Sequence, residues 1–322
     1  MPTRCVNIPK FRNFKISLVL LLLLTLPAIP APAPGVIWPE GTYMTSIPLK
    51  RAGRLCMVEA TIDGVTGNLI FDTGATGLIL NSTYFRNAWT VRGTEAGGVA
   101  GSAGAVRKTV VKKLQIAGLL YPNVGAEVTD LGHIENRRGV KVLGLFGSGM
   151  LRDMEVVIDV AGNRVSLYRL DRTGKRIGPA AGTFRADLTT RIQVVQDVMF
   201  VRATIGAKEL NFCLDTGAES NILSSSMPGK VMNTVTITRR ADLQGVGGGR
   251  NDMLFGLLGD FSIGTKKISG MQTLISSLDD MSAFYEFQVD GMLGYDFFEQ
   301  GIVSLNLVTR QMGIMFRKGG KP

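Results

Sequence analysis

Two aspartates occupy the same short motif in this 322-residue chain. Residues 72–75 and 215–218 both read DTGA, and each copy follows an apolar run and precedes an Ile-Leu pair. A glycine directly after Asp-Thr suits a tight turn that needs close backbone approach. Two carboxyl groups held close together cannot both ionise cheaply, so they share one proton. The ionised member can then take a proton from water while its protonated partner donates a hydrogen bond to the substrate.

One such motif is a weak signal, but both copies lie at matching positions of an internal repeat. Residues 58–82 align without a gap with residues 201–225, and 12 of 25 positions are identical. Beyond a small insertion in the second copy the register holds again, and Gly144–Gly147 aligns with Gly291–Gly294. A tandem duplication is therefore predicted. If the two copies pack about an approximate two-fold axis, equivalent positions near the axis face each other, which would bring Asp72 and Asp215 together.

The elements expected to position the aspartates are short strands. Val58, Ala60 and Ile62 alternate with other residues as one inward strand face, and Asp63-Gly64 is a hairpin turn signal. The return strand then delivers Asp72 to its turn. The chain contains 40 glycines and few long amphipathic patterns, which favours a mostly β protein.

These motifs resemble the pepsin and retropepsin superfamily of aspartic peptidases, and are most similar to a bacterial type with two fused retropepsin-like lobes. Residues 145–147 (LFG) and 292–294 (MLG) match the second signature of that superfamily, which braces the active-site loop. The resemblance implies an all-β fold, with two homologous closed-barrel lobes related by a pseudo-two-fold axis. It also implies an aspartic endopeptidase that acts on an extended polypeptide and needs no cofactor or metal.

The resemblance further assigns roles to individual residues. Asp72 and Asp215 would be catalytic, with the threonines interlocking through their hydroxyls and the glycines supporting the turns (Thr73, Gly74, Thr216, Gly217). A glycine-rich hairpin in each copy would act as a flap over the substrate; the alternative is a plain surface loop. The expected flap residues are Gly98, Val99, Gly101, Gly245, Val246 and Gly248.

Two departures from pepsins affect the expected chemistry. Pepsins usually carry Ser or Thr after Asp-Thr-Gly, whereas Ala75 and Ala218 stand here, as in retropepsins. Without a hydroxyl to stabilise the carboxylate, the pair should titrate higher, so we expect activity to extend toward about pH 5–7. In addition, no pepsin-like flap tyrosine is found.

Residues 1–34 have the parts of a secretory signal: a basic start, an apolar run over residues 16–26, and small residues with prolines. Export to the periplasm or medium is expected; the alternative is a membrane anchor formed by residues 16–26. The copies are expected to form an N-terminal lobe (35–170) and a C-terminal lobe (183–318), joined by a Gly/Pro/Ala-rich linker (171–182). We expect a monomer that contains an intramolecular pseudo-dimer.

Composition excludes several other classes of protein. Cys56 and Cys213 are the only cysteines after the signal segment, so no disulfide framework or CxxC zinc site is present; whether the two pair is left open. His133 is the single histidine and is expected in a surface loop. The net charge of +10 is spread over the chain rather than gathered in one stripe, which argues against nucleic-acid binding.

Two other functions compete with peptide hydrolysis. A peptide-binding protein of the same fold without turnover is the main alternative, although such a protein would usually have lost one aspartate. A glycoside hydrolase also uses two carboxylates, but has little reason to place them in two copies of one motif. Apolar residues beside the motifs fit either substrate subsites or the core (Ile79, Leu80, Ile222, Leu223, and Val99 and Val246 of the flaps).

Overall fold

The computed structural model describes residues 35–87, 89–98, 101–179, 182, 184–244 and 250–317. The predicted signal or anchor (1–34) and four of the predicted flap residues (Val99, Gly245, Val246, Gly248) lie outside these residues.

The first copy folds into an eight-stranded sheet whose strand order is β2-β3-β4-β9-β5-β8-β7-β6. Its strands are β2 (Lys50–Ala52), β3 (Leu55–Ile62), β4 (Val65–Asp72), β5 (Leu78–Asn81), β6 (Trp89–Gly98), β7 (Gly101–Ile116), β8 (Leu119–Thr129) and β9 (Val142–Gly147). Because β3 also pairs with β7, the six strands from β3 to β7 in this order close into a barrel.

The predicted strand and turn at the start of this barrel are confirmed. Val58, Ala60 and Ile62 are all buried. Asp63 and Gly64 both have positive φ angles, of 47° and 87°, as a type I′ two-residue hairpin turn requires.

The second copy repeats these pairings in a ten-stranded sheet. Its strands are β13 (Gln193–Val195), β14 (Val198–Ile205), β15 (Lys208–Leu214), β16 (Asn221–Ser224), β17 (Val235–Gln244), β18 (Arg250–Leu258), β19 (Phe261–Ile263), β20 (Lys266–Ile268), β21 (Met271–Ser276) and β22 (Gly291–Leu293). The equivalent of β7 is interrupted by a bend at Gly259 and Asp260, which divides it into β18 and β19, so this lobe is a half-barrel.

A six-stranded sheet joins the copies in the order β1-β11-β10-β23-β24-β12. It is made of β1 (Met44–Pro48), β10 (Met154–Asp159), β11 (Arg164–Arg169), β12 (Leu188–Arg191), β23 (Gly301–Asn306) and β24 (Gln311–Phe316). Val157 of β10 pairs with Ser304 of β23 in the antiparallel register. Ser304 occupies the position in the second copy that Val157 occupies in the first, so the pseudo-two-fold axis passes between them.

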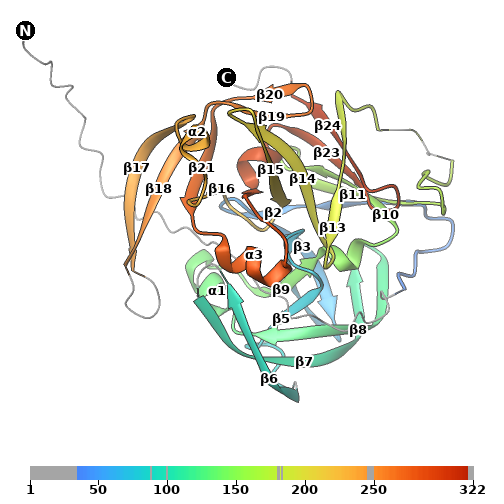
Figure 1. Ribbon diagram of the computed structural model, residues 1–322. Helices are drawn as coiled ribbons and strands as arrows, with labels where there is room; N and C mark the ends of the chain where they lie inside the picture. The colour runs from blue at the N-terminus through green and yellow to red at the C-terminus, as the bar shows by residue number, and fades with distance from the viewer. Residues whose placement is uncertain are drawn as a thin grey trace, which may run out of the picture.

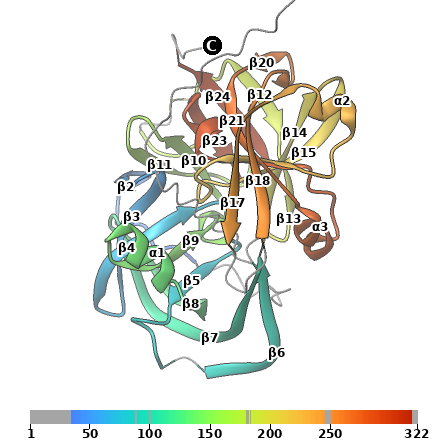
Figure 2. The same ribbon diagram turned by 90° about the vertical axis from the view of Figure 1, so that its left-hand side faces the viewer.

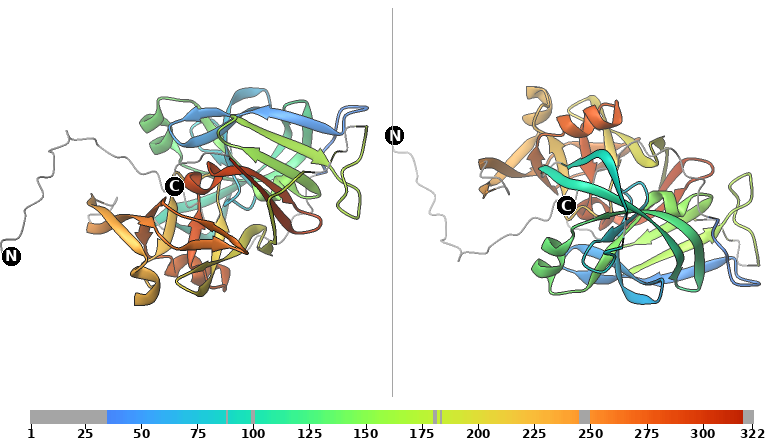
Figure 3. Two further views of the ribbon diagram at one scale, coloured as in Figure 1. Left: turned by 90° about the horizontal axis from the view of Figure 1, so that it is seen from above. Right: turned by 90° about the horizontal axis from the view of Figure 1, so that it is seen from below.

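The second copy, drawn mainly in yellow to red, lies above the first copy in Figure 1, and Figure 3 shows the two halves side by side. The predicted all-β, two-lobed acid-protease fold is confirmed. The predicted lobe and linker boundaries stay a prediction.

Helices are short in the described part of the chain, and none of them is long and apolar enough to cross a membrane. They are α1 (Gly132–Arg138), η1 (Ser148–Leu151), α2 (Gly229–Met232), α3 (Asp279–Tyr285) and α4 (Tyr295–Phe298). His133 lies in α1, so the expectation of a loop position is wrong; the helix ends at Gly139, whose φ of 62° is left-handed.

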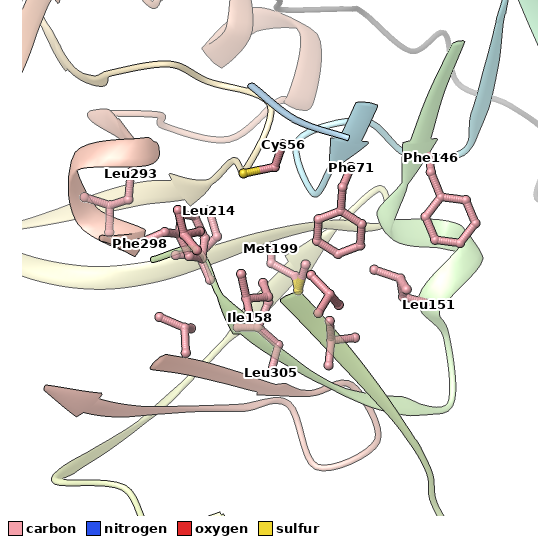
Figure 4. Packing of buried hydrophobic residues seen from close by; sticks show 14 of the residues in the cluster. Cys56, Phe71, Phe146, Leu151, Ile158, Met199, Leu214, Leu293, Phe298 and Leu305 are labelled. Atoms are coloured by element: carbon pink, nitrogen blue, oxygen red, sulfur yellow. The ribbon is translucent and has the colours of Figure 1, made fainter. Parts of the chain in front are cut away.

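One buried cluster extends through both copies (Figure 4). Phe71 and Leu214, which precede the two aspartates, belong to it together with Ile158 and Leu305 of the joining sheet. The residues that precede the two aspartates are therefore packed in one core, which supports both turns.

Candidate active site

Asp72 ends β4, and Asp215 directly follows β15. Each of these strands is paired in parallel with the strand that carries the second signature, β4 with β9 and β15 with β22. Both aspartate side chains are almost fully buried, with 2% of each residue exposed. The chain therefore delivers two acidic groups to the interior from equivalent strand ends.

The two carboxyl groups are hydrogen-bonded to each other. Within each turn, the backbone N–H groups of Gly74 and Ala75 donate to Asp72 Oδ1 at 2.9 and 3.1 Å. The second turn repeats this geometry, with Gly217 and Ala218 donating to Asp215 Oδ1 at 2.8 and 3.1 Å. One oxygen of each carboxyl group is thus fixed by its own turn.

Glycine is required after each Asp-Thr because the opposite carboxyl group lies against it. A Cβ on Gly74 would lie 2.6 Å from Cγ of Asp215, and a Cβ on Gly217 would lie 2.6 Å from Cγ of Asp72. No real Cβ fits at such distances, so the glycines set how closely the two lobes approach.

The two threonines lock the turns together across the axis. Thr73 Oγ1 donates to the carbonyl of Leu214 at 2.8 Å and accepts from the N–H of Thr216 at 3.0 Å. Thr216 Oγ1 donates to the carbonyl of Phe71 at 2.7 Å and accepts from the N–H of Thr73 at 3.0 Å. The interlocking that the resemblance implied for these hydroxyls is present in the hydrogen bonds.

The second-signature glycines pack against the turns from behind. A Cβ on Gly147 would lie 2.6 Å from the carbonyl oxygen of Ala75, and one on Gly294 would lie 2.7 Å from that of Ala218. The next residue in each copy donates its N–H to the same carbonyl, Ser148 at 2.8 Å and Tyr295 at 2.9 Å. Each aspartate turn is therefore held by its own lobe and by the opposite one.

Burial determines the protonation of the pair. It raises the pKa of Asp72 to about 6, against the opposing effect of its hydrogen bonds from Asp215 and the turn amides. Burial, followed by the negative charge of Asp72, raises the pKa of Asp215 well above its usual range. Burial and mutual repulsion thus favour a state in which the two carboxyl groups hold one proton between them.

Comparison with known proteins identifies the family. A model of the family described as "Aspartyl protease" matches residues 58–149 and again 201–297, which together make up more than half of the chain. The chain belongs to the aspartyl protease family.

The fold is also found in a solved structure. An aspartic proteinase from Irpex lacteus has the same fold, with a TM-score of 0.51 and 12% identity, over 85% of this chain and 98% of that one. Basic 7S globulin from soybean matches with a TM-score of 0.49 and 10% identity, over 87% of this chain and 97% of that one. No curated protein matches the sequence significantly.

Two ion pairs that the sequence did not predict link the lobes near the second aspartyl protease motif. Arg54 pairs with Asp296, and Arg138 with Glu219, the second residue after Gly217. The partners of each pair lie far apart along the chain, so no local pattern reveals them. The repeat offered one signal, because Arg54 aligns with Asp197 in the other copy, a residue of opposite charge.

The predicted flaps are only partly described. Gly98 pairs with Gly101 at the end of the β6–β7 hairpin, so these two glycines lie at a hairpin tip as expected. In the second copy, the β17–β18 pairing is described up to Gln244 and Arg250. These two strands form a long antiparallel pair at the edge of their sheet, and the pair faces the viewer in Figure 2.

Other candidate groups belong to the core. Ile79, Leu80, Ile222 and Leu223 are at most 2% exposed, which decides for core packing over substrate subsites. Cys56 and Cys213 are free and buried, which settles the pairing that the sequence left open. Among the residues that the structure describes, no group of three or more His, Cys, Asp or Glu side chains is arranged to hold a metal ion.

Proposed function

We propose that this chain is an aspartic endopeptidase in which Asp72 and Asp215 activate a water molecule for attack on a peptide bond. The observation that supports it most directly is the hydrogen bond between two buried carboxyl groups, one from each copy of the repeat. A structural role alone does not require two acids to share a proton at the centre of the molecule, where each imposes a desolvation cost.

The proposed roles follow from the different pKa values. Asp72, which ionises first, takes a proton from the water, and the resulting hydroxide adds to the carbonyl carbon of the scissile bond. Asp215, which is protonated, donates a hydrogen bond to the carbonyl oxygen as negative charge develops there. Asp72 then gives the proton that it took from water to the leaving nitrogen, and the C–N bond breaks as the carbonyl re-forms. The geometry needed for these steps would be maintained by Thr73 and Thr216.

The substrate and the location remain parts of the proposal. We propose that the β6–β7 and β17–β18 hairpins act as flaps over an extended polypeptide, since glycine-rich hairpin tips suit a gate. Export is proposed from the composition of residues 1–34.

Cleavage-site mapping by mass spectrometry with a denatured protein and a peptide library tests the proposal. The wild-type protein should cleave, whereas Asp72→Asn and Asp215→Asn should each lose at least about 10³-fold in kcat/KM, as when an essential acid or base is removed. Asp153→Asn is the matched control, because Asp153 is exposed and its φ of 61° is one that asparagine tolerates.

The control should retain wild-type activity. If pure, folded wild-type protein cleaves no peptide between acid and neutral pH, peptide hydrolysis is rejected in favour of peptide binding without turnover. Binding of the same library to the wild-type protein would then be the measurement that supports that alternative.

A further inference from the structure

Two interlobe contacts are made by turns at equivalent positions of the repeat, and the residues in these turns carry opposite charges. Arg54 lies in the turn between β2 and β3, and Asp197 lies at the equivalent place in the second copy, in the turn between β13 and β14. Each turn docks on the segment that follows the second signature of the other copy. Arg54 contacts α4, and Asp197 contacts the end of η1.

Both contacts are well-formed ion pairs. Arg54 Nη1 donates to the two carboxylate oxygens of Asp296 at 3.0 and 2.9 Å, and to the backbone carbonyl of Glu219 at 3.1 Å. Arg152 Nε donates to Asp197 Oδ1 at 3.1 Å, and its Nη2 pairs with Oδ2. The Arg152–Asp197 side chains are about one-third exposed, whereas Asp296 is nearly buried.

Within each copy, the turn and the segment on which the other copy's turn docks carry charges of the same sign. The N-terminal copy has Arg54 in the turn and Arg152 after η1. The C-terminal copy has Asp197 in the turn and Asp296 in α4, with Glu299, the equivalent of Arg152, directly after α4. Opposite charges therefore meet only when an N-terminal lobe packs against a C-terminal lobe.

We infer that this inverted charge pattern makes each lobe selective for the other lobe and against a second copy of itself. In a pairing of two N-terminal lobes, Arg54 would face Arg152. In a pairing of two C-terminal lobes, Asp197 would face Asp296 and Glu299. Like charges placed together in an interface are strongly unfavourable, and such repulsion is a common source of specificity.

A third pair follows the same rule. Arg138 of α1 pairs with Glu219, and both side chains are largely buried. Their equivalents in the repeat are Tyr285 and Thr76. Only the pairing of unlike lobes brings an arginine to a glutamate at this place, so the buried charges are matched in one arrangement alone.

A charge swap in the full-length chain tests the inference. Arg152→Glu combined with Asp197→Arg keeps an opposite pair at the second contact, but makes both turns basic and both docking segments acidic. Like lobes of two molecules then become complementary. After refolding from urea at low and high protein concentration, size-exclusion chromatography with light scattering should show an association constant for dimers at least about tenfold above wild type.

The matched control is Arg202→Glu with Glu209→Arg, which swaps an exposed ion pair within one lobe and preserves net charge. This control should behave as the wild type. Two molecules can also exchange lobes, so that each N-terminal lobe packs against the C-terminal lobe of the other molecule. Such dimers keep opposite charges together in the wild type, the swap variants and the control, so they contribute equally to all of these proteins. The readout needs no hydrolysis, so it stands apart from the proposed activity.

The reciprocal swap, Arg54→Asp with Asp296→Arg, makes both turns acidic and guards against a failure of the first variant to fold. An excess of dimers in either swap variant supports the inference. Failure of both variants to exceed wild type, or an equal excess in the Arg202/Glu209 control, would overturn it.

Discussion

Gly74 lies against the carboxyl group of Asp215, so closely that a Cβ there would approach Cγ to 2.6 Å. Gly217 has the same relationship to Asp72. The distance between the two carboxyl groups therefore depends on the lack of a side chain at Gly74 and Gly217.

Adding a methyl group at this place should separate the acids without unfolding the chain. We expect Gly74→Ala to lower kcat/KM by about 100-fold, the loss typical of a misplacement of about 1 Å. Gly77→Ala is a control within the same turn, because a Cβ on Gly77 meets nothing within 4 Å. Steady-state kinetics on a cleaved peptide measures both, and equal activities of the two variants would contradict this account of the spacing.

Removing one interlocking hydroxyl should destabilise the whole molecule. Thr216→Val leaves the carbonyl of Phe71 and the N–H of Thr73 buried without their partner. We expect the free energy of unfolding to fall by about 3 kcal/mol, since each unpaired buried group costs about 1–3 kcal/mol. Urea denaturation measures this loss. Thr216→Ser retains the hydroxyl and should recover most of the stability; a serine variant as unstable as the valine variant would point to packing instead.

The pH dependence of hydrolysis should follow the ionisation of Asp72 and Asp215. Because the pKa of Asp72 is raised to about 6, kcat/KM should rise as pH increases through about 6, where this base becomes ionised. It should fall at higher pH, where Asp215 loses its proton. Ala75→Ser, which adds a hydroxyl beside the carboxylate, should move the rising limb to lower pH. A profile with its maximum only near pH 2 would refute the expectation.

Stability should also depend on pH, in a direction set by the raised pKa values. The folded protein binds protons at the pair more tightly than the unfolded chain, in which the usual aspartate value of 3.8 applies. The contribution of the pair therefore favours folding at low pH and is lost progressively above about pH 4, first as Asp72 ionises through about pH 6 and further as Asp215 ionises. Relative to wild type, Asp72→Asn with Asp215→Asn should gain at least about 2 kcal/mol between pH 4 and pH 7, which is the part that the raised pKa of Asp72 accounts for by itself.

Denaturation curves of both proteins at the two pH values measure that difference. A constant difference between wild type and the double variant would mean that the two acids have ordinary pKa values in the folded state.

Much of the fold could be predicted because the local hydrophobic pattern and the internal repeat indicated the same strands and turns. Alternation in residues 58–62 and the Asp63-Gly64 turn indicated the first hairpin, and the repeat transferred it to the second copy. The aspartate pair followed from symmetry. His133 was placed wrongly because a seven-residue helix carries too little periodicity to be distinguished from a loop.

The parts that escaped prediction depend on contacts between distant segments. The joining sheet pairs β1 with β11 and β12 with β24, and nothing in residues 44–48 or 188–191 indicates those partners. Ion pairs such as Arg54–Asp296 are equally distant in sequence. The residues Ile79 and Leu223 could be core or subsite from sequence, because an apolar side chain next to a turn fits both until its burial is known.

The small insertion in the second copy lies between the aspartate turn and the outer hairpin of that lobe. This interval contains α2, whereas residues 82–87 of the first copy contain no helix. The added residues thus enter upstream of β17, away from the strands that fix Asp72 and Asp215. The two lobes therefore differ at their outer edges while the aspartate turns stay symmetric, so the polypeptide substrate proposed above would meet a differently shaped edge at each of its two ends.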